Sequence, residues 1–342
     1  MKQALYYEKK EDKKVRCFLC PHHCLIKDGG VGLCKARKNS DGELYTLNYG
    51  RISSAHMDPI EKKPLYHFYP GSWIMSLGTL GCNLSCSFCQ NASISQLPKD
   101  KYEGYFKAYS KEASVEDIVK LIRDSASKGN IGAAYTYNEP SIWYEFVLEC
   151  AREINKIGMK NVLVTNGFLE AEPARELFPY IDAANVDIKS INPKFYTKLC
   201  GGKLEPVLEY CKIARDSGVL LEVTNLIITG ENDSEEDLSN LVGWVAENLG
   251  RDTPIHFSRY HPDYEFNAPP TDSRVLAKAY ELGIKKLDYV YVGNIWADEW
   301  NVTRCPSCHK VIIDRSGFKV RKVALEDKNH CQYCQAEVNI VN

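Results

Sequence analysis

The sequence predicts an α/β protein, a partial (β/α)6-type TIM barrel flanked by small cysteine-rich N-terminal and C-terminal metal-binding modules. Three observations predict it. Short apolar runs alternate with amphipathic stretches over residues 69–300, which is typical of parallel strands joined by right-handed helical crossovers. Residues 1–68 are rich in Cys, His and Gly turns and show no long periodic helix. Residues 301–342 carry two Cys-x2-Cys pairs around a short hairpin-like segment.

The apolar runs predict strands at residues 73–80, 131–137, 161–165, 183–188, 220–229, 255–258 and 289–292. The amphipathic stretches predict helices at residues 115–128, 142–157, 171–179, 205–217, 234–249 and 272–287. Ser114 and Ser234, each followed by Asp at the third position, indicate capped helix starts. Four glycines mark the expected helix ends: Gly129, Gly158, Gly218 and Gly250.

Composition is that of an ordinary globular protein. The 342 residues include 43 Lys and Arg against 45 Asp and Glu, a formal net charge of −2, with 44% hydrophobic residues. This excludes a disordered or fibrous chain and argues against a generally basic nucleic-acid binder. The chain has no apolar run of about 18 residues and no apolar signal-peptide core. We therefore expect a cytoplasmic protein without a membrane partner.

Three groups of cysteines stand out among the 14 in the chain. Cys82, Cys86 and Cys89 form a tight trio directly after the first predicted strand of the barrel. Clustered cysteines in a long chain of a reducing compartment indicate metal sites rather than disulfides. Three soft thiolates suit zinc, Cu(I) or an iron–sulfur cluster and leave one coordination position open. A zinc site completed by a distant His is the alternative interpretation.

Polar residues gather where the predicted strands end. Apolar runs end in residues 137–140 (Tyr-Asn-Glu-Pro), 165–167 (Thr-Asn-Gly), 187–189 (Asp-Ile-Lys) and 258–262 (Ser-Arg-Tyr-His-Pro). Barrel enzymes place their chemistry at this end of the strands, so several such groups predict a lined cavity. Taken singly, each has a structural explanation: Asp187 and Lys189 can form an ion pair, and Glu139 before Pro140 can begin a helix.

The Cys-x3-Cys-x2-Cys trio at the end of the first strand resembles the signature of the radical S-adenosylmethionine (SAM) superfamily. Residues 15–342 resemble more closely the AmmeMemoRadiSam system radical SAM enzymes, relatives of pyruvate formate-lyase activating enzyme. The resemblance runs through residues 16–24, 63–71, 81–83, 135–140, 164–167, 184–189, 204–208, 258–264 and 291–294. It implies that Cys82, Cys86 and Cys89 are the catalytic cysteines. They would hold a [4Fe–4S] cluster whose open iron binds SAM.

The resemblance also implies cofactor contacts. Phe88 would lie against the adenine, and residues 136–139, including Tyr137, Asn138 and Glu139, would replace the Gly-Gly-Glu-Pro segment that touches the methionine amino group. Asn166, Asp187 and Lys189 resemble contacts to the ribose and carboxylate of SAM. Thr224 stands where activating enzymes carry a basic residue, and His261 matches a histidine on the adenine side.

The flanking cysteines predict two further metal sites. Cys305, Cys308, Cys331 and Cys334 form a zinc-ribbon pattern, which indicates a structural Zn²⁺, with a rubredoxin-like iron site as the alternative. Cys17, Cys20, Cys24 and Cys34 favour a second four-thiolate zinc site. An auxiliary iron–sulfur cluster, or a site in which His22 or His23 replaces one Cys, is the alternative there.

The expected function is therefore that of a radical SAM enzyme on an unidentified small-molecule or protein substrate. The resemblance implies AMMECR1-like and Memo-like partners and a reduced ferredoxin- or flavodoxin-type electron donor. A glycyl-radical-enzyme activase is the first alternative. A non-catalytic zinc-ribbon protein that binds nucleic acid is the second, although short basic clusters are its only support in the sequence.

Overall fold

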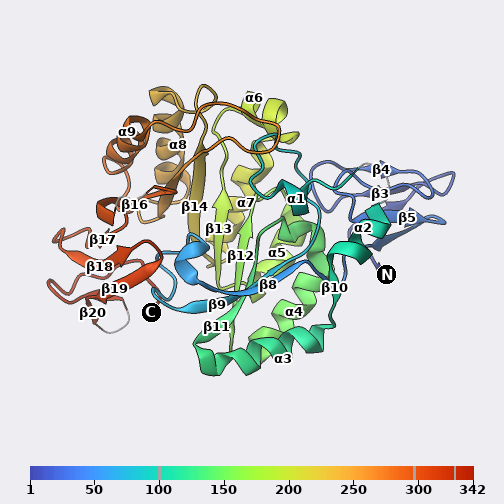
Figure 1. Ribbon diagram of the computed structural model, residues 1–342, viewed down its shortest axis with the longest axis horizontal. Coiled ribbons are helices and arrows are strands. Elements are labelled where there is room, and N and C mark those ends of the chain that lie inside the picture. The colour runs from blue at the N-terminus through green and yellow to red at the C-terminus, as the bar shows by residue number, and fades with distance from the viewer. Residues whose placement is uncertain (99–101, 296–297, 327–328) are drawn as a thin grey trace.

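The structure of the protein is a computed structural model that describes residues 1–98, 102–295, 298–326 and 329–342 (Figure 1). A mixed eight-stranded sheet forms its centre, in the order β16-β15-β14-β13-β12-β11-β9-β8. The strands are β8 (Ser54–Pro59), β9 (Trp73–Gly78), β11 (Asn130–Tyr135), β12 (Lys160–Thr165), β13 (Ala183–Asp187), β14 (Leu220–Ile227), β15 (Ile255–Arg259) and β16 (Val290–Gly293). The seven strands from β9 to β16 in this order run parallel to one another.

Six connections between these parallel strands carry the predicted helices. They are α3 (Val115–Ser125), α4 (Tyr144–Lys156), α5 (Ala171–Leu177), α7 (Glu205–Asp216), α8 (Glu235–Asn248) and α9 (Ser273–Gly283). Ser114 and Asp117 form the predicted capping box, and Ser234 accepts the amide hydrogen of Asp237. All four glycines predicted at helix ends have positive φ, which confirms the predicted alternation.

Strand β8 was not predicted. It pairs antiparallel with β9 over its whole length, from Ser54 opposite Gly78 to Pro59 opposite Trp73. Its sequence, Ser-Ala-His-Met-Asp-Pro, has no apolar run, because an edge strand pairs on one side and buries few of its side chains. Residues 54–59 therefore belong to the central sheet, although the predicted N-terminal region spans residues 1–68. The predicted domain boundaries otherwise stay a prediction.

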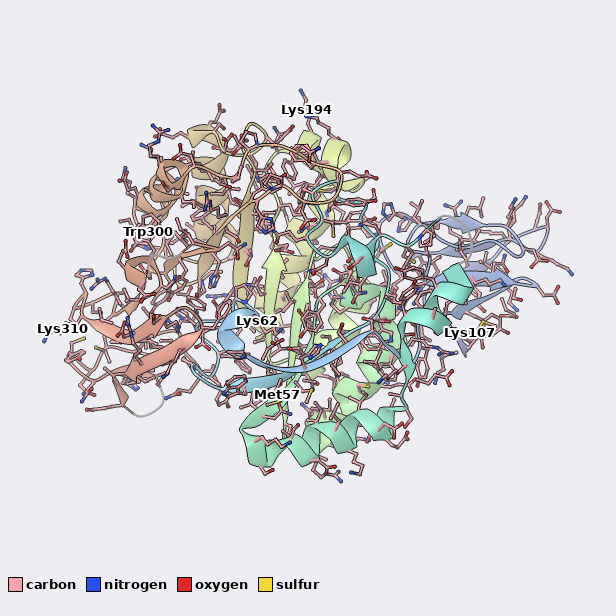
Figure 2. The ribbon with its side chains drawn as sticks, in the orientation of Figure 1. Met57, Lys62, Lys107, Lys194, Trp300 and Lys310 are labelled. Carbon is pink, nitrogen blue, oxygen red and sulfur yellow. The ribbon has the colours of Figure 1, made fainter. Side chains whose placement is uncertain are left out.

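The two ends of the chain lie at opposite ends of the molecule (Figure 1). Short antiparallel strands fill the N-terminal region: β1 (Lys2–Gln3), β2 (Tyr7–Lys9), β3 (Val15–Cys17), β4 (Leu25–Ile26), β5 (Arg37–Ser40), β6 (Glu43–Thr46) and β7 (Arg51–Ile52), the last paired with β10 (Lys111–Glu112). The C-terminal module, residues 301–342, contains β17 (Thr303–Arg304), β18 (Val311–Ser316), β19 (Lys319–Val323), β20 (Leu325–Glu326) and β21 (His330–Cys331). In Figure 2, Lys310 marks the outer edge of this module and Lys107 of α2 (Tyr102–Tyr109) lies toward the opposite end.

The main core lies on the face of the sheet that the helices cover and includes Val147 and Ile154 of α4 and Val223 of β14. A smaller cluster on the other face includes Ile74 and Val162. A separate small cluster around Ile312 and Ile313 packs the C-terminal module. Among the described residues, no helix combines the length and the apolar character that crossing a membrane requires.

Candidate functional site

The cysteine trio lies on the loop that follows β9, at the side of the sheet where the carboxyl ends of all the parallel strands lie. Loops after two other strands hold its backbone. Asn138, after β11, accepts the amide hydrogen of Thr79 (3.0 Å) and donates to the Gly81 carbonyl (2.8 Å). After β13, the carbonyl of Cys200 accepts from Ser85 N at 2.8 Å. The position of the trio is therefore set by three strands that are separate in the sequence.

The trio thiols are free and mostly enclosed. Cys86 is buried, and Cys82 and Cys89 are partly buried. Burial raises the pKa of the Cys82 thiol, and the nearby Glu139 carboxylate raises it further. A thiol in this setting becomes a thiolate when a cation or a metal lies beside it. The loop therefore places three sulfur ligands in a region from which water is largely excluded.

Two asparagines connect Cys82 to the neighbouring strand ends. Asn166, after β12, donates its amide to Asn83 Oδ1 at 2.9 Å and approaches Cys82 Sγ at 3.6 Å. Asn83 in turn donates to the Phe168 carbonyl at 2.7 Å. Asn83 is a site residue that sequence reasoning missed, although its place beside Cys82 was the available signal. The predicted Asn166 thus lies directly beside the trio.

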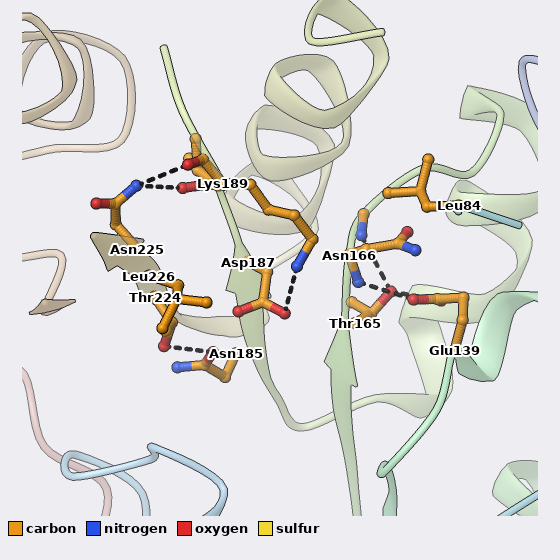
Figure 3. A network of polar contacts seen from close by, with 12 residues as sticks. Leu84, Glu139, Thr165, Asn166, Asn185, Asp187, Lys189, Thr224, Asn225 and Leu226 are labelled. Atoms are coloured by element: carbon orange, nitrogen blue, oxygen red, sulfur yellow. Dashed lines mark hydrogen bonds and ion pairs between the residues drawn. The ribbon is translucent and has the colours of Figure 1, made fainter. Parts of the chain in front are cut away.

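Glu139 is fully enclosed and turned toward the Thr-Asn-Gly segment (Figure 3). Its carboxylate accepts from Thr165 Oγ1 (2.7 Å), Asn166 N (2.8 Å) and Ser141 N (2.9 Å). Burial raises the pKa of Glu139, while these donors favour its charged form. Because three protein groups already donate to its carboxylate, Glu139 acts here as a positioning residue for Asn166.

Lys189 provides a cation at the end of β13 (Figure 3). Its ammonium pairs with Asp187 at 3.2 Å, and its side chain is 16% exposed. Burial by itself lowers the pKa of Lys189, but the Asp187 carboxylate and the Cys86 and Cys200 thiols raise it well above its ordinary value. The ammonium therefore stays charged beside the trio, where it can attract an anionic group.

Cys200 is the second site residue that the sequence did not reveal. It ends a π-helical turn, Tyr196–Cys200, and its thiol lies near enough to the Cys86 thiol to interact with it. This contact lowers the pKa of Cys86. In the sequence, Cys200 stands alone, 111 positions after Cys89, so no spacing pattern could have indicated it. π-Helical turns of this kind are frequent at functional sites.

The side chains of four other predicted residues contact neighbouring protein groups. Phe88 is buried against Phe195 and Phe266, with ring centroids at 5.7 and 6.5 Å. Tyr137 donates its hydroxyl to Asp58 at 2.6 Å, on the β8 side. Thr224 donates to Asn185 Oδ1 at 2.8 Å within the sheet (Figure 3). His261 is exposed, with its Nε2 at 3.2 Å from Gln90.

A large cavity of about 990 Å³ opens near His261. Residues from both edges of the sheet line it: Pro59 and Trp73 from β8 and β9, and Gly293 and Asn294 at the end of β16. The turn between β18 and β19 in the C-terminal module contributes Phe318. The cavity is large enough for a nucleoside-sized or larger molecule.

The two flanking cysteine groups differ in geometry. Cys305 and Cys334 have their sulfurs 3.6 Å apart, and those of Cys308 and Cys331 are 3.7 Å apart. All four ligand atoms lie within 4.8 Å of one another. Cys17, Cys20, Cys24 and Cys34 line one common pocket but form no such close group, although all of them are described.

Comparison with known proteins identifies the class. A family model of the radical SAM superfamily matches residues 77–245, the segment that contains the trio and its strand-end neighbours. A radical SAM methyltransferase from Sphaerobacter thermophilus shares the fold, with a TM-score of 0.50 and 15% identity over 66% of this chain and 67% of that one. The chain therefore carries a radical SAM domain and belongs to this superfamily.

Two relatives of known sequence are similar to this chain over all or part of its length. "Uncharacterized protein MJ0808" of Methanocaldococcus jannaschii is 44% identical over 345 residues, which cover 100% of both chains, so the two belong to one family. "Pyruvate formate-lyase 1-activating enzyme" of Escherichia coli is 25% identical over 186 residues, 53% of this chain and 71% of that one. Superfamily membership supports an enzyme and implies a [4Fe–4S] cluster and SAM as cofactors.

The trio fits such a cluster. Its three thiols come from one loop and are enclosed, and they are not drawn together as a single-metal site: among the described residues, the sulfurs within 4.8 Å of one another belong to the C-terminal group. In a cubane, each cysteine binds a different iron, so its sulfurs lie farther apart than around one zinc ion. The donor set of three thiolates leaves the fourth iron open.

Proposed function

We propose that this protein is an enzyme that cleaves SAM reductively and uses the product radical to take hydrogen from a substrate still to be identified. The observation that carries the proposal is the enclosed trio of free thiols that interacts with the Lys189 ammonium, inside the segment that matches the superfamily. A [4Fe–4S] cluster with bound SAM supplies methionine and a 5′-deoxyadenosyl radical when it receives one electron.

The chain's own residues then have distinct tasks. Cys82, Cys86 and Cys89 hold the cluster. Lys189 attracts the carboxylate of SAM, while Asp187 keeps the ammonium charged and oriented. Glu139 fixes the backbone of Asn166, so that the Asn166 amide stays beside Cys82. The remaining predicted contacts, Phe88, Tyr137, Asn138, Thr224 and His261, belong to the same proposal.

The sheet is proposed to curve into a partial barrel around the substrate cavity. Support comes from the cavity lining, because β8 and β16 stand at opposite ends of the strand order and residues at the ends of both contribute to it. A curved sheet brings its two edges together in this way. The C-terminal module covers one side of the opening through Phe318.

A structural Zn²⁺ is proposed for the C-terminal module. Zn–S bonds of ~2.3 Å in a tetrahedron place sulfurs ~3.8 Å apart. The two Sγ–Sγ distances of 3.6 and 3.7 Å match this value. The proposed partners are AMMECR1-like and Memo-like proteins and a reduced ferredoxin- or flavodoxin-type donor, and the proposed location is the cytoplasm.

A glycyl-radical activase remains the second candidate function. The similarity to the Escherichia coli activating enzyme over 53% of this chain favours it. Activation of a partner enzyme, detected as a glycyl radical signal that depends on this protein and SAM, would establish that function.

The decisive experiment for the first proposal measures 5′-deoxyadenosine. Anaerobically reconstituted protein should form it from SAM when dithionite is added, and the Cys82→Ala, Cys86→Ala and Cys89→Ala variants should form none. Cys200→Ala is the matched control, because its thiol contacts Cys86 without belonging to the proposed ligands. Undiminished product in the trio variants would overturn the assignment.

A further inference from the structure

We propose that Cys17, Cys20, Cys24 and Cys34 hold a second iron–sulfur cluster, fully ligated by cysteine, directly beside the trio. The sequence alone favoured zinc at this place. The structure reverses that preference through the spacing of the sulfurs, the environment of the thiols and the contacts between this group and the trio loop. The presence of the second cluster does not depend on the proposed reaction, whereas its use as an electron carrier rests on that proposed function.

The three cysteine groups provide an internal comparison of spacing. Zinc gathers its ligands around one ion, and the C-terminal group shows the result, with all four sulfurs within 4.8 Å of one another. Within the part of the chain that the structure describes, neither the trio nor the N-terminal four form a group this tight. The N-terminal group thus resembles the trio, whose superfamily implies an iron–sulfur cluster, and differs from the zinc-like group.

The four N-terminal thiols nevertheless surround one space. They line a common pocket whose other walls include Leu19, Ile26 and Ile142. Gly32 faces this pocket at a point where an added Cβ would lie 3.8 Å from both Cys24 Sγ and Cys34 Sγ. Convergent thiols around one apolar pocket, less closely gathered than the C-terminal four, suit a cluster of several irons.

Hydrogen-bond donors surround the sulfurs. The buried Arg37 guanidinium approaches Cys17 Sγ at 3.8 Å through Nη1. The backbone amides of His22 and Ala36 favour the thiolate forms of Cys20 and Cys34. Such donors stabilise the negative charge that cysteine-bound clusters carry and adjust their reduction potentials.

The N-terminal group and the trio loop are in direct contact. The His22 ring nitrogen Nε2 donates to the Asn83 carbonyl at 2.6 Å, and Asn83 is the residue next to Cys82. Gly81 precedes Cys82 with φ +97°, and a Cβ added to it would lie 2.8 Å from the Cys34 carbonyl oxygen. Asn83 itself lines the N-terminal pocket.

This contact would allow the second cluster to pass electrons to the cluster at the trio. A one-electron donor of the ferredoxin or flavodoxin class would reduce it by one electron, and it would be reoxidised when that electron passes to the cluster at the trio. A structural zinc ion, which has no redox chemistry, has no such reason to lie against the catalytic loop.

The test uses the full chain with Cys82, Cys86 and Cys89 all replaced by Ala. After anaerobic reconstitution with iron and sulfide, this variant should still contain about four irons and four sulfides per chain, with a single zinc ion. Its reduced paramagnetic resonance signal should not change when SAM is added, because every iron already has a cysteine ligand. Two zinc ions and no iron per chain would overturn the proposal.

A second pair of variants locates the cluster. Adding Cys20→Ala and Cys24→Ala to the triple variant should remove the remaining iron, whereas adding Cys150→Ala, a buried cysteine of α4, should leave it in place. If the variant that lacks Cys20 and Cys24 fails to fold, the iron and zinc contents of the triple variant still decide between cluster and zinc. Iron that persists in a folded variant without Cys20 and Cys24 would contradict the assignment.

Discussion

The N-terminal region and the C-terminal module each have a fully buried arginine at their contact with the rest of the molecule, at α4 for the first and at the segment between β8 and β9 for the second. Arg37 pairs with Glu145 of α4 and donates to the Leu5 carbonyl at 2.7 Å. Arg315 lies 3.6 Å from Glu61 and donates to the Tyr66 carbonyl at 2.6 Å. Each buried charge is thus matched by a carboxylate and a carbonyl oxygen.

The same two regions differ in how they hold their cysteines. The C-terminal thiols come from two knuckles of one small module and lie close together. The N-terminal thiols are spread around a pocket that borders the trio loop through Asn83. A buried arginine docks both regions, and at the N-terminal side the same Arg37 also contacts Cys17 Sγ of the cysteine group. The two regions therefore differ in the spacing and the neighbours of their sulfurs rather than in how they dock.

The largest effect is expected when the cysteine group of the C-terminal module is removed. Replacing Cys305 and Cys331 by Ala should remove one zinc ion per chain and make residues 301–342 sensitive to protease, because structural zinc contributes roughly 10–16 kcal/mol of apparent binding energy. Iron content should stay unchanged. Metal analysis and limited proteolysis measure both, and a protease-resistant module without zinc would refute a structural role for the ion.

The next effect tests the docking of the N-terminal region. Glu145→Ala leaves the buried Arg37 charge without its carboxylate, so the free energy of unfolding should fall by about 3–5 kcal/mol. Glu153→Ala in the same helix is the control, since its pair with Lys156 (2.6 Å) is exposed and should contribute at most ~1 kcal/mol. Urea unfolding measures the free energy of unfolding of both variants. An equal decrease in the two would show that the buried pair stabilises the protein no more than the exposed one.

A smaller, pH-dependent effect tests the docking of the C-terminal module. His67 donates to the Asn339 carbonyl (2.5 Å) and accepts from the Tyr291 hydroxyl (2.7 Å), and burial lowers its pKa to about 4. In the unfolded chain, this pKa is about 6.5, so protons bind preferentially to the unfolded state between these values. Stability from neutral His67 should be complete above pH 6.5 and decline by about 3 kcal/mol as the pH falls to 4.

His67→Gln sharpens this test. A glutamine side chain can also donate and accept a hydrogen bond but does not titrate in this range. Urea unfolding measured from pH 7 to pH 4 should therefore show a flatter acid limb in the variant than in the original protein. An identical acid limb in both proteins would show that another group controls the pH dependence.

Much of the fold followed from local pattern. Strand–helix alternation and the glycines with positive φ predicted seven parallel strands and six helical connections, because each of these elements buries one face in a regular period. Strand β8 and the short strands of the N-terminal region were missed, since they are edge or two- to four-residue strands with little apolar period.

The site followed from the sequence where its residues share a short motif or stand at the end of a predicted strand. The trio and the strand-end Asn166, Asp187 and Lys189 do meet at one edge, as parallel strands require. Cys200 was not predicted, because a π-helical turn brings it to Cys86. The Tyr137 hydroxyl donates to Asp58, which also pairs with Lys63, a contact that no local pattern indicated. The expected contact of Tyr137 with SAM stays a prediction.

The central claim is that the trio holds a cluster with one iron open to SAM. Electron paramagnetic resonance of the reduced, oxygen-free protein, recorded with and without SAM, tests it most directly. We expect SAM to change the signal in the original protein and in Cys200→Ala, and to change nothing in the variant without Cys82, Cys86 and Cys89. A spectrum of the original protein that is indifferent to SAM, or a change that persists without the trio, would contradict the account.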